Sequence, residues 1–368
     1  METLISILIT LGASVVFAIV GTVLGCLLSG IDRIISARMQ GRVGPPLLQP
    51  LYDVRKLFAK DNVAVNGTIG TYVVCALIFT FLAGGIFFSG GNFLLCVFVI
   101  TLAELMFVMA AYASRSPFSE AGAHRENLQI MAYEPMVLLL AVGFFQATGS
   151  FDIAILPFLD SPIIFSLWGV FLGMLFILTI KLRKSPFDLS YSHHAHQELV
   201  KGVTTEMSGK TLGQIEIMHW CENILYMGWI VMFFIWGNPV SIAVALIAFV
   251  LIYVLEIWID NNFARVKWQA CLKSAWLVAL VMGVVNLFYV CKEVTCLLFQ
   301  NLLGSYITTV RAVTVAISRC WPHSRHSMMS SALASSILAT PNMLISSWLR
   351  VVSTNAISML LRKSTIRW

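Results

Sequence analysis

The chain has 368 residues, of which 58% are hydrophobic and only 11% are charged, and its formal net charge is +6. Soluble domains carry roughly 25% charged residues, so this composition excludes an ordinary soluble protein. Several apolar runs reach the roughly 20 residues that an α-helix needs to cross a bilayer. The composition therefore predicts an all-α integral membrane protein.

The apolar runs predict about eight transmembrane helices. No basic residue precedes the first run, and the run is longer than the apolar part of a secretory signal, so we expect a retained helix. The helices are expected at 4–31, 69–88, 92–112, 129–148, 163–181, 213–236, 240–259 and 271–290.

The connections between these helices alternate in charge. The segments 32–68, 113–128, 181–212 and 260–273 contain sixteen Lys and Arg residues, whereas the turns between the other helices contain none. Cytoplasmic loops of membrane proteins carry an excess of Lys and Arg. We therefore expect large cytoplasmic loops after helices one, three, five and seven of a multi-pass protein in the inner (plasma) membrane, with both ends of this core outside.

The composition changes near residue 294. We expect residues 1–293 to form the membrane domain, because 294–368 contain no Asp or Glu, seven Lys or Arg and thirteen Ser. One interpretation of this basic tail is an amphipathic segment on the membrane surface. The interpretation we favour is a tail that is unstructured or translated out of frame, and we assign it no function.

Ionisable side chains inside the expected helices are candidates for an ion path. A charge at the centre of a membrane helix costs about 2.5–3.5 kcal/mol on insertion scales, so such residues are rare and functional by default. Three of them follow one another at a spacing of three in the sixth helix and span an arc of about 120°. The alternative is that these groups pair across helices or cap backbone. The candidates are Glu104, Glu134, Glu216, His219, Glu222 and Glu256.

The third charged loop contains a group of possible metal ligands: His193, His194, His196 and Glu198. Their spacing is not that of a zinc helix such as HExxH, and histidines near a partner protein can serve in hydrogen bonding. The eight cysteines include no CxxC pair and no Cys/His cluster with metal spacing. We therefore expect no metal site, iron–sulfur cluster or other cofactor in this chain, and assign redox chemistry to partners.

Two loops resemble those of a known family. The sequence Gln40-Gly-Arg-Val-Gly-Pro-Pro-Leu-Leu-Gln-Pro-Leu-Tyr-Asp-Val-Arg-Lys-Leu-Phe58 is similar to the loop after helix one of the complex I membrane subunit that docks the hydrophilic arm. Ser185-Pro-Phe-Asp188, Gln197-Glu-Leu-Val-Lys-Gly202 and Glu206-Met-Ser-Gly209 resemble its second signature loop. The first loop lacks a longer insert, and the second has His193-His-Ala-His-Gln-Glu in place of an acidic stretch. Both departures resemble the corresponding membrane subunit of energy-converting (Ech-type) nickel–iron hydrogenase, and its relatives in CO-induced hydrogenase and formate hydrogenlyase.

The resemblance implies a non-catalytic subunit of an oxidoreductase complex. This subunit would anchor soluble partners and couple electron transfer from ferredoxin to movement of H⁺ or Na⁺. The implied partners are hydrogenase large and small subunits, an iron–sulfur subunit and an antiporter-like membrane subunit, in the lipid bilayer and without nucleic acid. The nickel–iron centre and iron–sulfur clusters would lie in those partners. The implied docking residues are Arg42, Asp53, Arg55, Lys56, Asp188, His193, His194, His196, Glu198 and Glu206.

Two other functions remain open from the sequence. A quinone-site subunit of a complex I-like NADH or ferredoxin dehydrogenase would share the fold and need a tight apolar tunnel near the first loop. A stand-alone secondary transporter is a different class. The eight expected spans show no obvious inverted repeat and no paired broken helices, which are typical of many such transporters.

Overall fold

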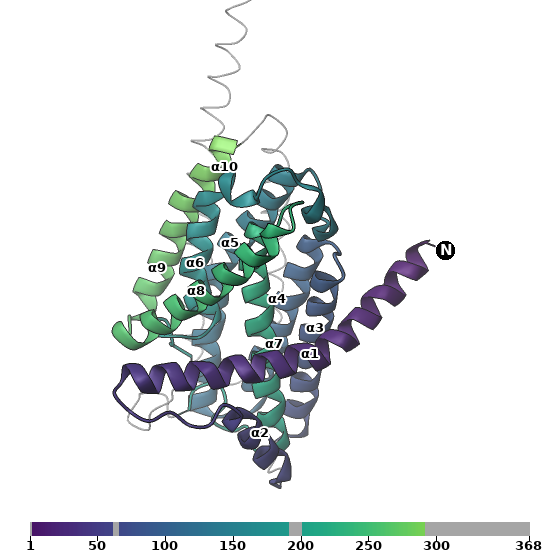
Figure 1. Cartoon of the computed structure of the whole chain (residues 1–368). Coiled ribbons are helices and arrows are strands. Elements are labelled where there is room, and N and C mark those ends of the chain that lie inside the picture. Colours follow the sequence, from purple (N-terminus) through teal and green to yellow (C-terminus); the bar gives the residue numbers. More distant parts are fainter. Residues whose placement is uncertain (1, 62–65, 191–200, 291–368) are drawn as a thin grey trace, which may run out of the picture. The chain divides into compact units, whose positions relative to one another are not determined.

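The computed structural model describes residues 2–61, 66–190 and 201–290, which belong to one compact unit. The expected tail, 294–368, and the candidates His193, His194, His196 and Glu198 lie outside the described residues. The α-helices are α1 (Glu2–Met39), α2 (Gln49–Ala59), α3 (Gly67–Phe88), α4 (Phe93–Ala113), α5 (Pro117–Thr148), α6 (Trp168–Lys181), α7 (Gly209–Val231), α8 (Val240–Asn262), α9 (Trp268–Val278) and α10 (Val285–Val290) (Figure 1).

The all-α membrane architecture expected from the sequence is confirmed. Within the described ranges, seven helices are long and apolar enough to cross a membrane; the seventh of these continues from α9 through a π-helical turn, Ala279–Val284, into α10. The fifth expected span, 163–181, is shorter than predicted. Residues 163–165 form a 3₁₀ turn after Pro162, and α6 begins only at Trp168. At 14 residues, α6 is roughly 21 Å long, less than the roughly 30 Å of a hydrocarbon core.

Hydrogen bonds gather the four basic connections at one end of the bundle. The Asn66 side chain donates to the carbonyl of Ala113, and the Ser119 hydroxyl donates to the carbonyl of Val203. The Ser185 amide donates to Asp260. The other turns meet at the opposite end, where the Phe93 amide donates to the carbonyl of Phe151 and the Gly237 amide to that of Leu159. The chain therefore alternates between two ends, as the loop charges predict.

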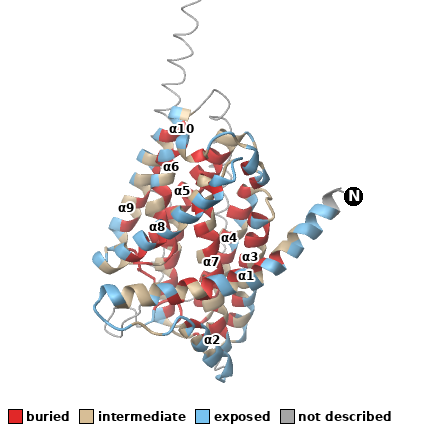
Figure 2. Ribbon diagram, in the orientation of Figure 1, coloured by how far each residue is buried: buried red, intermediate tan, exposed pale blue. Residues whose placement is uncertain are grey.

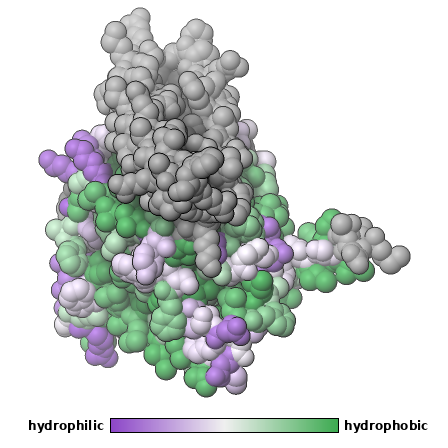
Figure 3. All heavy atoms as spheres, turned by 90° about the horizontal axis from the view of Figure 1, so that it is seen from above, coloured by the Kyte–Doolittle hydropathy of each residue, from purple (hydrophilic) through white to green (hydrophobic). Residues whose placement is uncertain are grey.

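The interior is lined by large apolar and aromatic side chains, while the outer helix faces are apolar and exposed. Buried residues concentrate on α4, α5 and α7 (Figure 2). Hydrophobic residues cover much of the visible rim when the bundle is seen from above (Figure 3). An exposed apolar band is what a lipid environment requires of a spanning helix. On α8 the band includes Ile242, Leu246, Ile247, Val250 and Leu251.

Helix α1 runs obliquely across other helices rather than beside them (Figure 1). Glycines allow this close crossing: Gly84 and Gly85 of α3 face Phe17 and Ser14 of α1, and any Cβ at either glycine would overlap those atoms. Small residues at helix interfaces are the usual means of close approach in membranes. Close contact with α3 therefore helps to hold α1 at this crossing.

This contact predicts that Gly84→Leu destabilises the protein by about 1–3 kcal/mol, because the new side chain overpacks the α1 interface. The matched control is Gly70→Leu on the same helix, where no atom lies within 4 Å of an added Cβ. The measurement is the midpoint of thermal unfolding in mild detergent. Equal midpoints for the two variants would contradict the role of Gly84 in seating α1.

Candidate functional site

Helix α6 ends inside the bundle and directs two cations into it. Its last turn is closed by hydrogen bonds from the Arg183 amide to the carbonyl of Ile180 and from the Lys184 amide to that of Thr179. This is the Schellman pattern, in which the residue after the cap is left-handed and usually glycine. Here it is Arg183, with φ 53°. An arginine in a conformation that favours glycine indicates that its side chain is needed at this place.

Lys181, the last residue of α6, forms a buried ion pair with Glu104 of α4. The Lys181 Nζ lies 2.7 Å from Glu104 Oε1, and both side chains are 3% exposed. The hydroxyls of Tyr133 and Tyr226 donate to the same carboxylate at 2.5 and 2.6 Å. The ammonium also lies 3.7 Å from the centre of the Tyr133 ring. The buried carboxylate of Glu104 thus accepts from three donors, and the buried ammonium of Lys181 has both this carboxylate and an aromatic face as partners.

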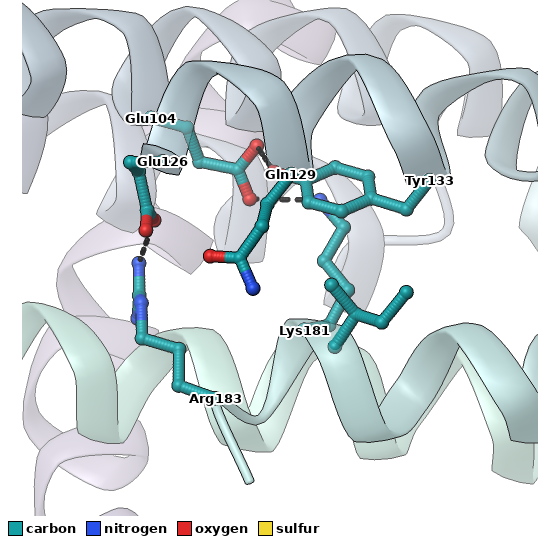
Figure 4. Close-up of a pocket in the computed structure, with 7 residues that line it drawn as sticks. Glu104, Glu126, Gln129, Tyr133, Lys181 and Arg183 are labelled. Atoms are coloured by element: carbon teal, nitrogen blue, oxygen red, sulfur yellow. Dashed lines mark hydrogen bonds and ion pairs between the residues drawn. The ribbon is translucent and has the colours of Figure 1, made fainter. Parts of the chain in front are cut away.

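Arg183 joins acids from two other helices. Its Nη2 lies 3.2 Å from Glu126 of α5, and its Nη1 lies 3.0 Å from Glu222 of α7. The His219 ring nitrogen Nδ1 lies 2.6 Å from Arg183 Nη1 and 3.0 Å from Glu222. Glu222 is fully buried. The arginine fork therefore holds α5 and α7 together through their carboxylates; its pair with Glu126 is drawn in Figure 4.

We call the residues around Lys181 and those around Arg183 the two ion-pair groups. Together they contain more acids than fixed cations, meaning side chains that are always positively charged. Glu134 of α5 is also fully buried, and its carboxylate accepts the Thr101 hydroxyl at 2.7 Å. Four buried carboxylates thus face Lys181, Arg183 and His219. An uncompensated buried charge is costly, and among the described residues the set has more carboxylates than cations to compensate them. We call this set the four-acid cluster: Glu104, Glu126, Glu134 and Glu222.

A second group of charges lies on the other side of the segment that follows α6. Lys184 Nζ lies 3.0 Å from Asp32 of α1 and 5.2 Å from the centre of the Tyr253 ring. Glu256 of α8 is fully buried, and neither carboxylate oxygen has a hydrogen-bond partner among the residues that the structure describes. Asp260 accepts the Ser185 amide at 2.8 Å. Glu256 is thus separate from the four-acid cluster.

The structure brings some of the predicted ion-path residues together and not others. Glu104, Glu134, His219 and Glu222 take part in the buried groups described above. Glu216 is half-buried, at the end of α7 that carries the basic loops. Its carboxylate acts on Lys201. Desolvation lowers the pKa of Lys201, and the charge of Glu216 offsets part of that decrease. Of the three residues spaced by three along α7, only His219 and Glu222 therefore contact each other.

The predicted docking residues differ in exposure. Arg42, Arg55 and Lys56 are exposed, and Glu206 is half-buried. Asp53 is half-exposed and pairs with Arg33 at 2.6 Å. Desolvation acts to raise the pKa of Asp53, but hydrogen bonds from Arg33 and Gln49 leave it below its ordinary value.

Asp188, by contrast, is buried, and it pairs with Arg265. Its carboxylate therefore joins the segment after α6 to the chain that follows α8. That internal contact accounts for Asp188 better than direct docking does.

Sequence reasoning missed the cations and one acid of the site. Lys181, Arg183 and Lys184 count among the sixteen basic loop residues, yet Lys181 and Lys184 are buried and Arg183 is largely so. Glu126 falls in a segment expected to be a loop, because α5 begins at Pro117 rather than 129. One signal was available. Several intramembrane acids with no intramembrane cation require a partner, and the nearest cations follow α6 directly.

No group of three or more His, Cys, Asp and Glu side chains that could hold a metal ion occurs in 2–61, 66–190 or 201–290. The chemistry of the four-acid cluster is therefore that of carboxylates, an imidazole, a lysine and an arginine within hydrogen-bond reach. Such a set can hold and transfer protons.

Comparison with known proteins identifies the family of this chain. A family model described as NADH dehydrogenase matches residues 11–291. The chain belongs to the NADH dehydrogenase family. The family expected from the two loops is thereby confirmed.

Relatives in this family include hydrogenase-4 component C of Escherichia coli (strain K12), which is 27% identical over 297 residues, with 72% of this chain and 93% of that protein covered. Formate hydrogenlyase subunit 4 of the same organism is 25% identical, with 68% and 89% covered. A membrane subunit of NADH-quinone oxidoreductase from Geobacillus thermodenitrificans is 26% identical, with 77% and 93% covered. All three relatives are thus matched along almost their full length.

The fold is also similar to that of a chain in the membrane-bound sulfane sulfur reductase, an archaeal respiratory membrane complex. The TM-score is 0.68 at 22% identity, and the likeness covers 77% of this chain and 99% of that one. At this identity the likeness bears on the fold alone.

The buried ion pair predicts that Lys181→Met destabilises the protein by about 3–5 kcal/mol, because it leaves Glu104 without its cation. The double variant Lys181→Met/Glu104→Gln should recover part of this loss, as the two residues are in contact. The measurement is thermal unfolding in mild detergent, with Lys267→Met, at an exposed position, as the control. Additive losses in the double variant would show that the pair is not coupled.

Proposed function

We propose that this chain is the membrane-anchoring and coupling subunit of a ferredoxin-linked energy-converting nickel–iron hydrogenase complex. It links electron transfer in a soluble arm to translocation of H⁺ or Na⁺. The observation that carries the proposal is the four-acid cluster, which lies deep in a membrane bundle and holds more acids than fixed cations. The relatives named hydrogenase-4 component C and formate hydrogenlyase subunit 4 support this branch of the family.

The second candidate is a quinone-site subunit of a complex I-like dehydrogenase. It is supported by the similar identity to the NADH-quinone oxidoreductase relative from Geobacillus thermodenitrificans. The two candidates differ in what the purified complex needs. A hydrogenase complex evolves hydrogen without added quinone, whereas the dehydrogenase requires quinone for turnover.

The proposal assigns the metal centres to partner proteins. Hydrogenase large and small subunits and an iron–sulfur protein bind at the end that carries the basic loops, which lies in the cytoplasm. An antiporter-like partner binds beside the bundle in the inner membrane. The surface around α2 supports the docking role, because it combines exposed cations with exposed apolar side chains. These are Arg42, Arg55 and Lys56 together with Val43, Leu47, Leu48, Leu51, Tyr52 and Phe58.

The docking role predicts that the double variant Arg55→Glu/Lys56→Glu lowers the amount of soluble subunits that co-purify with the tagged chain in mild detergent. Reversing two exposed charges acts on partner recognition and should leave the fold intact, because surface substitutions change stability by only about 0.5 kcal/mol or less. The control is the charge reversal Asp160→Lys, at an exposed acid near the opposite end of the bundle. Unchanged recovery of partners with the α2 variant would remove α2 from the docking surface.

The coupling role predicts the behaviour of Glu222→Gln. The substitution keeps size and hydrogen bonding but removes the proton exchange of the carboxylate, while Glu126 still compensates Arg183. We expect an assembled complex with normal hydrogenase activity toward a soluble dye. The ratio of ion gradient formed to hydrogen evolved in membrane vesicles should fall to that of an uncoupled complex.

Glu120→Gln, an exchange at a half-exposed acid of α5, serves as the control and should keep the ratio. An unchanged ratio in Glu222→Gln would make Glu222 a structural acid. If the same exchange at Glu104, Glu134 and Glu126 also left the ratio unchanged, the chain would be an anchor only.

A further inference from the structure

A small cavity lies between the two ion-pair groups of the four-acid cluster. The Glu126–Arg183 pair lies on one side of it and the Glu104–Lys181 pair on the other, with the Gln129 side chain between them (Figure 4). The residues that line it are Glu104, Glu126, Gln129, Tyr133, Ile180, Lys181 and Arg183. All but one of these side chains are polar, so the space between the pairs is suited to a polar occupant.

One polar atom at this cavity is left unsatisfied. Glu126 Oε1 accepts from Arg183, but Glu126 Oε2 is buried and has no hydrogen-bond partner within the part of the chain that the structure describes. A buried acceptor without a donor costs about 1–3 kcal/mol. Buried water molecules typically supply such missing bonds, provided that the space is polar and has several partners.

Gln129 is oriented to provide a second partner. Its Nε2 donates to the backbone carbonyl of Phe187, in the segment after α6. Because the amide nitrogen is fixed there, the amide oxygen is the group left to face the cavity. Figure 4 shows this oxygen turned toward the side of Glu126 and Arg183. Gln129 is 4% exposed, so its conformation is set by its neighbours.

We propose that this cavity holds one water molecule, which connects the two ion-pair groups, and that Gln129 is the positioning residue for that water. The water is hydrogen-bonded to Glu126 Oε2, donates to Gln129 Oε1, and lies beside the Glu104 carboxylate. This proposal rests on the coupling function proposed above and specifies the step between Glu126 and Glu104.

The step conserves protons and needs no other reactant. A proton on Glu126 Oε2 moves to the water oxygen as one of the water's own protons moves to Glu104. Two O–H bonds break, one on Glu126 and one on the water, and two form, one on the water and one on Glu104, so the water is regenerated.

The test uses Gln129→Met in the assembled complex. Methionine keeps the length of the side chain but has neither the amide oxygen nor the amide donor. The control is Gln146→Met, the same exchange on the same helix at a residue that does not line the cavity. The measured quantity is again the ratio of ion gradient to hydrogen evolved in membrane vesicles. This ratio does not depend on how much complex assembles, so a loss of stability alone would not change it.

We expect Gln129→Met to lower the ratio of ion gradient to hydrogen evolved by more than half, while its dye-linked hydrogenase activity stays unchanged. Gln146→Met should have the same ratio as the unmutated complex. A normal ratio in Gln129→Met, together with a lowered ratio in Glu222→Gln, would overturn the water link and leave the coupling function standing. Normal ratios in both would overturn the water link and make Glu222 a structural acid. The coupling function would fall with them only if Glu104→Gln, Glu126→Gln and Glu134→Gln also kept the normal ratio.

A second measurement covers the case in which Gln129→Met does not assemble. A high-resolution map of the unmutated complex should contain a water peak within hydrogen-bond distance of Glu126 Oε2 and Gln129 Oε1. An empty cavity in that map would overturn the proposal.

Discussion

The fold depends on compensating two cations that α6 carries into a membrane bundle. Lys181 and Arg183 have little contact with bulk water, and a buried charge is tolerated only when it is paired and hydrogen-bonded. Helices α4, α5 and α7 supply the carboxylates, so their positions around α6 are fixed by charge as well as by packing. The non-helical segment after α6 is possible for the same reason, since irregular backbone at membrane depth must be enclosed by protein.

The segment after α6 connects parts of the molecule that are otherwise far apart in sequence. Arg183 faces the four-acid cluster, whereas the adjacent Lys184 faces Asp32 of α1 and the buried Glu256 of α8. A few residues further on, Asp188 pairs with Arg265, and the Phe187 carbonyl accepts from Gln129. The same segment leads into the loop that resembles the family's docking signature. The few residues after α6 thus contact both groups of buried acids.

The sequence predicted the fold class, most helix positions and the family, because these depend on apolar run length, loop charge and two loop motifs. It predicted the end of α6 at Lys181 but not its start, since the residues before Trp168 are as apolar as a helix and include a 3₁₀ turn instead. The intramembrane acids were found because charges stand out in apolar runs. Their partners were not, because Lys181 and Arg183 lie at a helix end, where a basic residue is usually at the membrane surface.

The number of acids is what distinguishes a coupling site from a structural one. An ion pair that only holds two segments together needs one cation for its carboxylate, as in the Asp188–Arg265 pair. The four-acid cluster has two fixed cations, and even a charged His219 would leave one carboxylate uncompensated. One carboxylate of the cluster is therefore left without a cation among the residues that the structure describes. The proposed coupling function requires such a surplus, because a carboxylate that is not held by its own cation is the one able to exchange a proton at small cost.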